Sequence, residues 1–182
     1  MKLLIASDIH GDISAAEAVK NVFEKEKCDK ILLLGDILYH GPRNDLPKDY
    51  APKEVIALLN GIKEKILAVR GNCDTEVDQM VLEFPILADY LLIYDGKITI
   101  FATHGHIYNT STPPTLAGIN VLLHGHTHVH IAKELENGTC YINPGSAALP
   151  KEGQKKSYAL YENGVFTVKA FDGSILLERS FN

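Results

Sequence analysis

Three short apolar segments in the first half of the chain each end directly in a polar cluster. Residues 2–7, 30–34 and 66–69 run into the clusters DIHGD, GDILYHG and RGNCD. Apolar runs of this length are typical of strands buried on both faces of a parallel sheet. The pattern predicts strand–helix–strand units whose polar residues gather outside the carboxyl ends of the strands.

Two helices are expected between these strands. Residues 14–17 read as a capping box and would begin the first helix. Val19, Val22 and Phe23 give that helix an apolar stripe. Pro52 would occupy the first position of the second helix, where proline is tolerated. The long irregular connection that precedes it is of the kind that often carries function.

The second half of the chain has a different character. Its β runs are separated by tight-turn dipeptides at residues 95–96, 137–138, 163–164 and 172–173. Asp-Gly and Asn-Gly turns of this kind predict antiparallel hairpins in a meander. Since no linker rich in Pro, Gly and Ser separates the halves, we expect one mixed α/β (α+β) domain over residues 1–182.

The composition narrows the function classes. The net charge of −5 gives no basic surface of the kind that duplex nucleic acid demands. Neither GxGxxG nor a Walker loop follows any predicted strand. The first apolar run is too short for a signal peptide or a membrane span. Three cysteines without CxxC spacing argue against a disulfide framework, so we expect a cytoplasmic protein with reduced thiols.

All eight histidines lie in or beside the polar strand ends, four of them in HGHTHVH at residues 124–130. Each ligand-capable residue taken alone could be an ordinary turn residue. Five separate strand ends that all deliver such a residue favour a metal site instead. The candidate ligands are Asp8, His10, Asp36, Asn72, His104, His126 and His128.

The chemistry of these ligands points to a catalytic site. Nitrogen and oxygen ligands without thiolate suit Mn²⁺, Fe or Zn²⁺. A closed structural zinc site would prefer cysteines. Asp36 has two carboxylate oxygens and can bridge two cations, and the amide oxygen of Asn72 is a neutral ligand.

The ordered series DIHGD, GD, GN, THGH and GHTH resembles the calcineurin-like metallophosphoesterase superfamily, and within it the bacterial YfcE-type phosphodiesterases. The resemblance covers nearly the whole chain, including GDILYHGPRN, AVRGNCD and NPGS. It implies a single-domain, four-layer αββα metallophosphoesterase sandwich. It also implies two divalent metal ions, with Mn²⁺ preferred over Zn²⁺, Fe or Ni²⁺.

The family pattern also implies a division of the ligands. The first metal would be held by Asp8, His10, Asp36 and His128. The second would be held by Asp36, Asn72, His104 and His126. Asp36 would bridge the two ions together with a water or hydroxide.

The implied activity is hydrolysis of small phosphodiesters by attack of a metal-bound hydroxide, so no protein nucleophile is needed. Extended nucleic acid and membranes are not expected as partners, whereas a homo-oligomer is compatible with exposed sheet edges. Alternatives are a phosphomonoesterase or nuclease of the same superfamily, or a non-catalytic scaffold with the same fold.

Cys73 marks a departure from the superfamily, because many members carry histidine after the ligand asparagine. With Asn72 and Asp36 it is a catalytic candidate, either as a neutral proton donor or as a small packing residue. Arg43, His40 and His106 are candidate substrate contacts, each with a structural alternative.

Overall fold

The three predicted parallel strands form one half of a six-stranded sheet in the computed structural model, which describes residues 1–181. They are β1 (Lys2–Ala6), β2 (Lys30–Leu33) and β3 (Ile66–Ala68). Both neighbouring pairs are parallel, as predicted. Three antiparallel strands extend the sheet in the order β11-β10-β9-β1-β2-β3, namely β9 (Ser157–Glu162), β10 (Val165–Ala170) and β11 (Ile175–Ser180).

A second sheet of five strands has the order β4-β5-β6-β8-β7. Its strands are β4 (Tyr90–Asp95), β5 (Ile98–Thr103), β6 (Val121–His124), β7 (Ile131–Glu134) and β8 (Cys140–Asn143). The expectation of an antiparallel second half is wrong for β5–β6 and β6–β8, which are parallel. The physical reason is that a long connection over residues 104–120 separates β5 from β6, and that β7 lies between β6 and β8 in the chain and pairs at the edge of the sheet.

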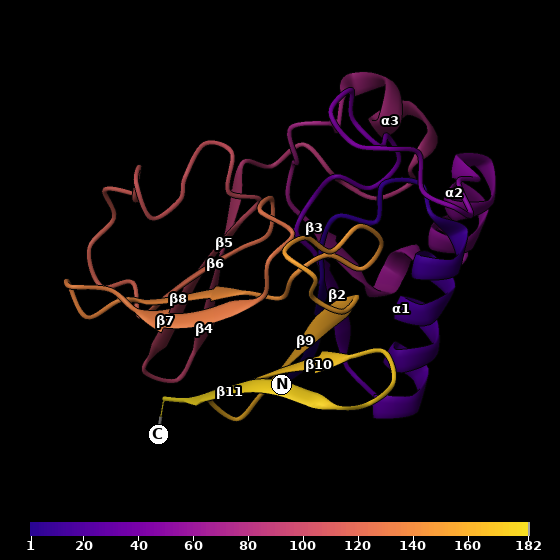
Figure 1. Cartoon of the computed structure of the whole chain (residues 1–182). Helices are drawn as coiled ribbons and strands as arrows, with labels where there is room; N and C mark the ends of the chain where they lie inside the picture. Colours follow the sequence, from indigo (N-terminus) through magenta and orange to yellow (C-terminus); the bar gives the residue numbers. More distant parts are fainter. Residues whose placement is uncertain (182) are drawn as a thin grey trace.

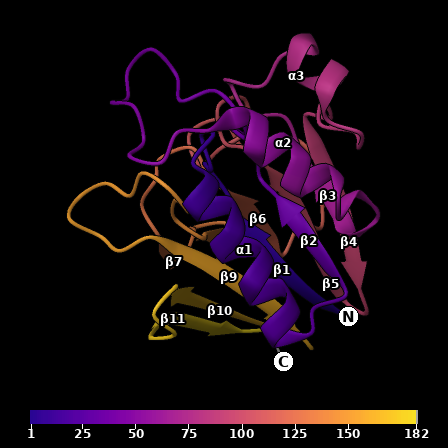
Figure 2. The same cartoon turned by 90° about the vertical axis from the view of Figure 1, so that its right-hand side faces the viewer.

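Helices cover the outer face of the six-stranded sheet (Figure 1; Figure 2). They are α1 (Ile13–Glu26) and α2 (Pro52–Asn60), followed along the chain by a 3-10 turn (Lys63–Lys65) and by α3 (Glu76–Val81). The predicted capping box at residues 14–17 is wrong. Asp12 is the N-cap of α1 and accepts a hydrogen bond from the Ala15 amide at 3.0 Å, while the Ser14 hydroxyl donates to Asp12.

Alternate residues of β1 supply two separate cores. Leu4 and Ala6 pack on the helical side, whereas Leu3 and Ile5 belong to the core between the sheets. The predicted two-sheet sandwich is therefore confirmed, with helices on the outer face of the six-stranded sheet. In the described residues the outer face of the five-stranded sheet carries an irregular segment in place of helices, and Tyr108 of that segment packs against the Phe101 ring.

None of the helices between residues 1 and 181 combines the length and apolar character that a bilayer crossing requires. All three cysteines are free and buried.

Candidate metal centre

All seven predicted ligands meet at one edge of the sandwich. Each follows the end of a strand: β1 delivers two of them, β2 and β3 one each, β5 one and β6 two. They are, in chain order, Asp8, His10, Asp36, Asn72, His104, His126 and His128. Distances of 3.8 Å or less link them into one continuous cluster.

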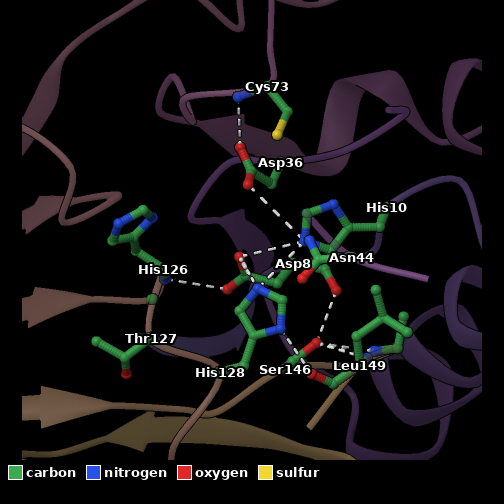
Figure 3. Close-up of polar contacts among 12 residues, drawn as sticks. Asp8, His10, Asp36, Asn44, Cys73, His126, Thr127, His128, Ser146 and Leu149 are labelled. Atoms are coloured by element: carbon green, nitrogen blue, oxygen red, sulfur yellow. Dashed lines mark hydrogen bonds and ion pairs between the residues drawn. The ribbon is translucent and has the colours of Figure 1, made fainter. Parts of the chain in front are cut away.

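The first part of the cluster contains Asp8, His10 and His128 (Figure 3). The Nε2 atoms of the two imidazoles lie 3.2 Å apart, and His128 Nε2 lies 3.2 Å from Asp8 Oδ1. Each ring places its Nδ1 on a backbone carbonyl, at 2.8 Å on Tyr39 and 2.6 Å on Leu149. Because a carbonyl only accepts, each Nδ1 carries a proton, and each Nε2 is left to face the site, with a lone pair whenever the ring is neutral.

This arrangement attracts positive charge. Two facing lone pairs cannot hydrogen-bond to each other, and the buried Asp8 Oδ1 has no hydrogen-bond partner among residues 1–181. Burial would lower the pKa of His10, but the adjacent Asp8 carboxylate raises it overall. Burial would raise the pKa of Asp8, yet His10 and His128 hold it well below its usual range. The donor atoms therefore fit a bound cation.

The second part of the cluster contains Asn72, His104 and His126 and is built in the same way. His104 donates from Nδ1 to the Leu34 carbonyl at 2.7 Å, so its Nε2 presents a lone pair. That atom lies 3.1 Å from Asn72 Oδ1 and 3.1 Å from His126 Nδ1. Two ring nitrogens and an amide oxygen thus converge on a small volume, and these donor atoms fit a second cation.

Asp36 lies between the two parts. Its Oδ2 atom is 3.8 Å from His10 Nε2 and 3.5 Å from His104 Nε2. Its Oδ1 atom accepts a hydrogen bond from the Cys73 amide at 2.8 Å, which fixes the carboxylate plane. One oxygen is thus turned toward both parts, as a bridging ligand requires.

The backbone at the site is held in a strained conformation. Asp8, His10, Asp36, His126 and His128 all have φ between 50° and 67°, the left-handed region that most side chains avoid. Several such residues in one place mark a functional site whose strain the surrounding fold offsets.

Two glycines allow the strand ends to approach. A Cβ at Gly71 would lie 2.1 Å from Asp36 Oδ1, and a Cβ at Gly125 would lie 1.9 Å from Ser7 Oγ. Both contacts are impossible for a larger residue. The glycine beside the ligand in GN and in GHTH is therefore required by packing.

Two supporting residues escaped the sequence analysis. Asp74 accepts hydrogen bonds from the amides of Asp36, Ile37 and Gly71 at 2.7–2.8 Å, and so ties the ends of β2 and β3 together. Burial raises the pKa of Asp74 to about 6, although the amides act in the opposite direction. The only sequence signal is its position directly after GNC.

Ser146 supports the other side of the site. Its hydroxyl donates to the Asp8 carbonyl at 2.9 Å and accepts from the Leu149 amide at 2.8 Å. Leu149 in turn holds His128. The NPGS motif thus braces two ligands, and the Pro-Gly turn in it was the available signal.

The three predicted substrate contacts differ in whether they line the pocket over the ligands. A pocket of about 340 Å³ opens over the ligands and is lined by Asp36, Arg43, Asn44, Asn72, His126, Thr127, His128 and Lys151. Arg43 is in this lining, and His40 and His106 are not. His40 packs edge-on against the Tyr39 and Tyr50 rings. His106 lies beside His104, and burial together with His104 lowers its pKa to about 4.

Cys73 lines a different hollow, of about 370 Å³, together with Leu38, Tyr39, Tyr50 and residues of α2 and α3. Its thiol accepts a hydrogen bond from the Asn72 amide group at 3.2 Å. Burial and the nearby Asp36 carboxylate raise its pKa well above the usual range of a thiol.

A family model described as a calcineurin-like phosphoesterase superfamily domain matches residues 1–164. The chain belongs to the calcineurin-like phosphoesterase superfamily. It is therefore a hydrolase of the phosphoesterase class, as the ordered motifs predicted.

Individual relatives agree with this assignment. The phosphodiesterase YfcE of Escherichia coli (strain K12) is 44% identical over 183 aligned positions, covering 100% of this chain and 99% of that protein. A solved structure of the E. coli protein superposes with a TM-score of 0.96 and full coverage of both chains. The probable metallophosphoesterase YsnB of Bacillus subtilis is 28% identical, over 94% of this chain and 91% of the relative.

A more distant structure shares the fold alone. Vps29 of Chaetomium thermophilum matches with a TM-score of 0.63 at 18% identity, covering 100% of this chain and 97% of that one.

Proposed function

We propose that this protein is a phosphodiesterase that hydrolyses small phosphodiesters with two divalent cations bound at the strand ends. One observation carries the proposal: ring nitrogens, carboxylate oxygens and an amide oxygen from both sheets converge at distances of 3.8 Å or less. The identity to a named phosphodiesterase supports the diester class. Mn²⁺ is our preferred metal, because nitrogen and oxygen donors are mixed and thiolate is absent from the donor set.

We assign Asp8, His10 and His128 to one cation, and Asn72, His104 and His126 to the other. Asp36 would bridge them through Oδ2. Cations bound there would activate a water, orient the phosphoryl group and neutralise charge in the in-line transition state. The chain supplies the fixed donors, which need no rearrangement during the reaction.

The remaining residues take supporting roles. Arg43 lines the pocket and is assigned to binding the substrate. His40 and His106 are assigned to packing around the ligands, since neither side chain lines the pocket. Cys73 is assigned to packing beside the donors, because its Sγ lies within 4.8 Å of a His10 ring nitrogen and an Asp36 carboxylate oxygen and its raised pKa keeps the thiol protonated. A neutral thiol here in place of a cationic histidine favours diesters, which carry one negative charge less than monoesters.

We further propose that the protein acts in the cytoplasm, on the basis of its three unpaired and buried cysteines. Extended nucleic acid and membranes are not proposed as partners, because the net charge is −5 and basic stripes are absent from the sequence.

The deciding experiment compares bis(4-nitrophenyl) phosphate with 4-nitrophenyl phosphate in the presence of Mn²⁺, Ni²⁺, Zn²⁺ and Mg²⁺ separately. We expect turnover of the diester with Mn²⁺, and a kcat/KM for the diester at least about tenfold above that for the monoester. Asp8→Asn serves as the matched inactive variant. A protein that binds the metals and hydrolyses neither compound would be a scaffold, and the proposal would be wrong.

A further inference from the structure

The pocket over the ligands carries two cations that the metal assignment does not use. Arg43 and Lys151 both line it, and Asp36 is the single acid in the lining. The other two arginines, Arg70 and Arg179, are paired with carboxylates. Within residues 1–181, neither Arg43 nor Lys151 forms an ion pair, so both charges are available to a ligand.

Lys151 is placed at the pocket by contacts to a proposed metal ligand. Its backbone amide donates to the His128 carbonyl at 3.1 Å, and the Leu149 carbonyl accepts from His128 Nδ1 at 2.6 Å. Ser146 anchors the same segment through the Leu149 amide. Figure 3 shows Leu149 and Ser146 next to the His128 ring. These hydrogen bonds hold residues 149–151 against His128, so the Lys151 backbone is fixed relative to the site.

The charges in the pocket exceed what a simple diester needs. A phosphodiester carries one negative charge, on the phosphoryl group, and that group would lie over the donor cluster. Arg43 and Lys151 are exposed residues of two separate loops that line the pocket, and the ester arms would extend from the donor cluster toward them. Since the protein as a whole carries a charge of −5, unpaired cations at this point are a local exception that favours an anionic arm.

We propose that Lys151, with Arg43, forms a subsite for a second anionic group on the substrate. The preferred substrates would then be phosphodiesters whose retained alcohol carries a carboxylate or a phosphate. The inference rests on the proposed phosphodiesterase function and adds the substrate class. Lys151 selects between substrates and takes no part in bond cleavage.

The test uses three 4-nitrophenyl phosphodiesters that share the leaving group and differ in the retained alcohol. The alcohols are ethanol, glycolate and choline, which make that arm neutral, anionic and cationic. With the Mn²⁺-loaded full chain we expect kcat/KM to fall in the order anionic, neutral, cationic, with about a tenfold step from the first to the second. Lys151→Gln should reduce the anionic-to-neutral ratio at least about threefold, and Lys151→Glu should reduce it further.

Lys155→Gln is the matched control. Lys155 lies in the same segment, is exposed and pairs with Asp172 at 2.8 Å, so its removal should leave both rates and the ratio unchanged. Calorimetry gives a second readout, with carboxymethyl and ethyl phenylphosphonates as probes that lack the aryloxy leaving group. The carboxymethyl probe should bind more tightly to the original chain, and Lys151→Gln should remove most of that difference.

The outcomes separate the two proposals. If the original chain hydrolyses none of the three diesters, the phosphodiesterase function fails, and calorimetry alone decides on Lys151. If it hydrolyses the neutral diester and Lys151→Gln lowers all three rates equally, Lys151 binds the shared phosphoryl group and the subsite is overturned. A ratio unaffected by either Lys151 variant overturns it as well.

Discussion

Single residues at this site carry conflicting demands. Asp36 has a left-handed backbone, its Oδ1 is held by the Cys73 amide, and its Oδ2 faces two imidazoles. Asp and Asn tolerate that backbone better than most side chains, because they can hydrogen-bond locally. The position therefore combines a backbone requirement with a charge requirement, and the two can be separated by substitution.

The variant Asp36→Asn separates the backbone requirement from the charge requirement. Asparagine tolerates the left-handed backbone and keeps the size, but it removes the charge that two cations would share. We expect the bound metal to fall from two ions per chain to one or fewer, with an affinity loss of about tenfold to a hundredfold. Elemental analysis after dialysis against Mn²⁺ measures this. The exposed Asp172→Asn should keep two ions, and equal metal content in both variants would contradict the bridging role.

Cys73→Ala tests the packing assignment. If the thiol only fills space, the ratio of rates for a 4-nitrophenyl diester and a phenyl diester should stay within about twofold of the original, because no proton donor is lost. Steady-state kinetics with the two leaving groups provide the ratio. A selective loss on the phenyl ester, whose leaving group needs a proton more, would instead make Cys73 the general acid.

At the scale of helices and strands, Glu26 connects three elements, which are α1, β1 and β10. It is the last residue of α1, and its carboxylate pairs with Lys169 of β10 at 3.0 Å and with Lys2 of β1 at 3.3 Å. The hydrogen bond from Lys169 is the largest of the effects that lower its pKa, and burial opposes it. The C-terminal end of a helix repels negative charge. The two lysines offset this repulsion and bind the end of α1 to the sheet.

This network makes part of the stability depend on pH. Because the folded pKa of Glu26 is lowered, its contribution is present above the unfolded value of about 4.3 and is lost as the pH falls through the folded value. Glu26→Gln should cost about 0.5–1 kcal/mol at pH 7, since the pairs are partly exposed, and less at pH 3. Urea unfolding at both pH values measures the difference. The exposed Glu17→Gln on the same helix should show no such trend, and a cost for Glu26→Gln that is equal at both pH values would refute the assignment.

At the scale of the whole molecule, the candidate centre connects the two sheets. The six-stranded sheet supplies Asp8, His10, Asp36 and Asn72, and the five-stranded sheet supplies His104, His126 and His128. The sheets otherwise share a core of apolar side chains. Bound cations would therefore act as a cross-link between them at one edge.

Metal loading should stabilise the chain accordingly. A cation at a hundred times its dissociation constant adds about 2.7 kcal/mol, which raises Tm by about 5–10 °C for a chain of this length. Calorimetric scans with Mn²⁺ and with a chelator measure the shift. Asp36→Asn should show a smaller one, and an unchanged Tm in the original chain would show that the donors hold no cation.

The sequence by itself predicted the candidate ligands, because each follows an apolar strand in an order that the family shares, and strand ends of parallel units meet at one edge. It also determined the parallel strands β1–β3 and the four tight turns, whose signals are local. The tertiary structure decided the rest. The cap of α1 depended on whether Asp12 or Ser14 reached the free amides, and the parallel pairing of β5, β6 and β8 depended on a crossover that local patterns do not encode. The contacts of Asp74, Ser146 and Lys151 join residues far apart in the chain, and only packing brings those residues together.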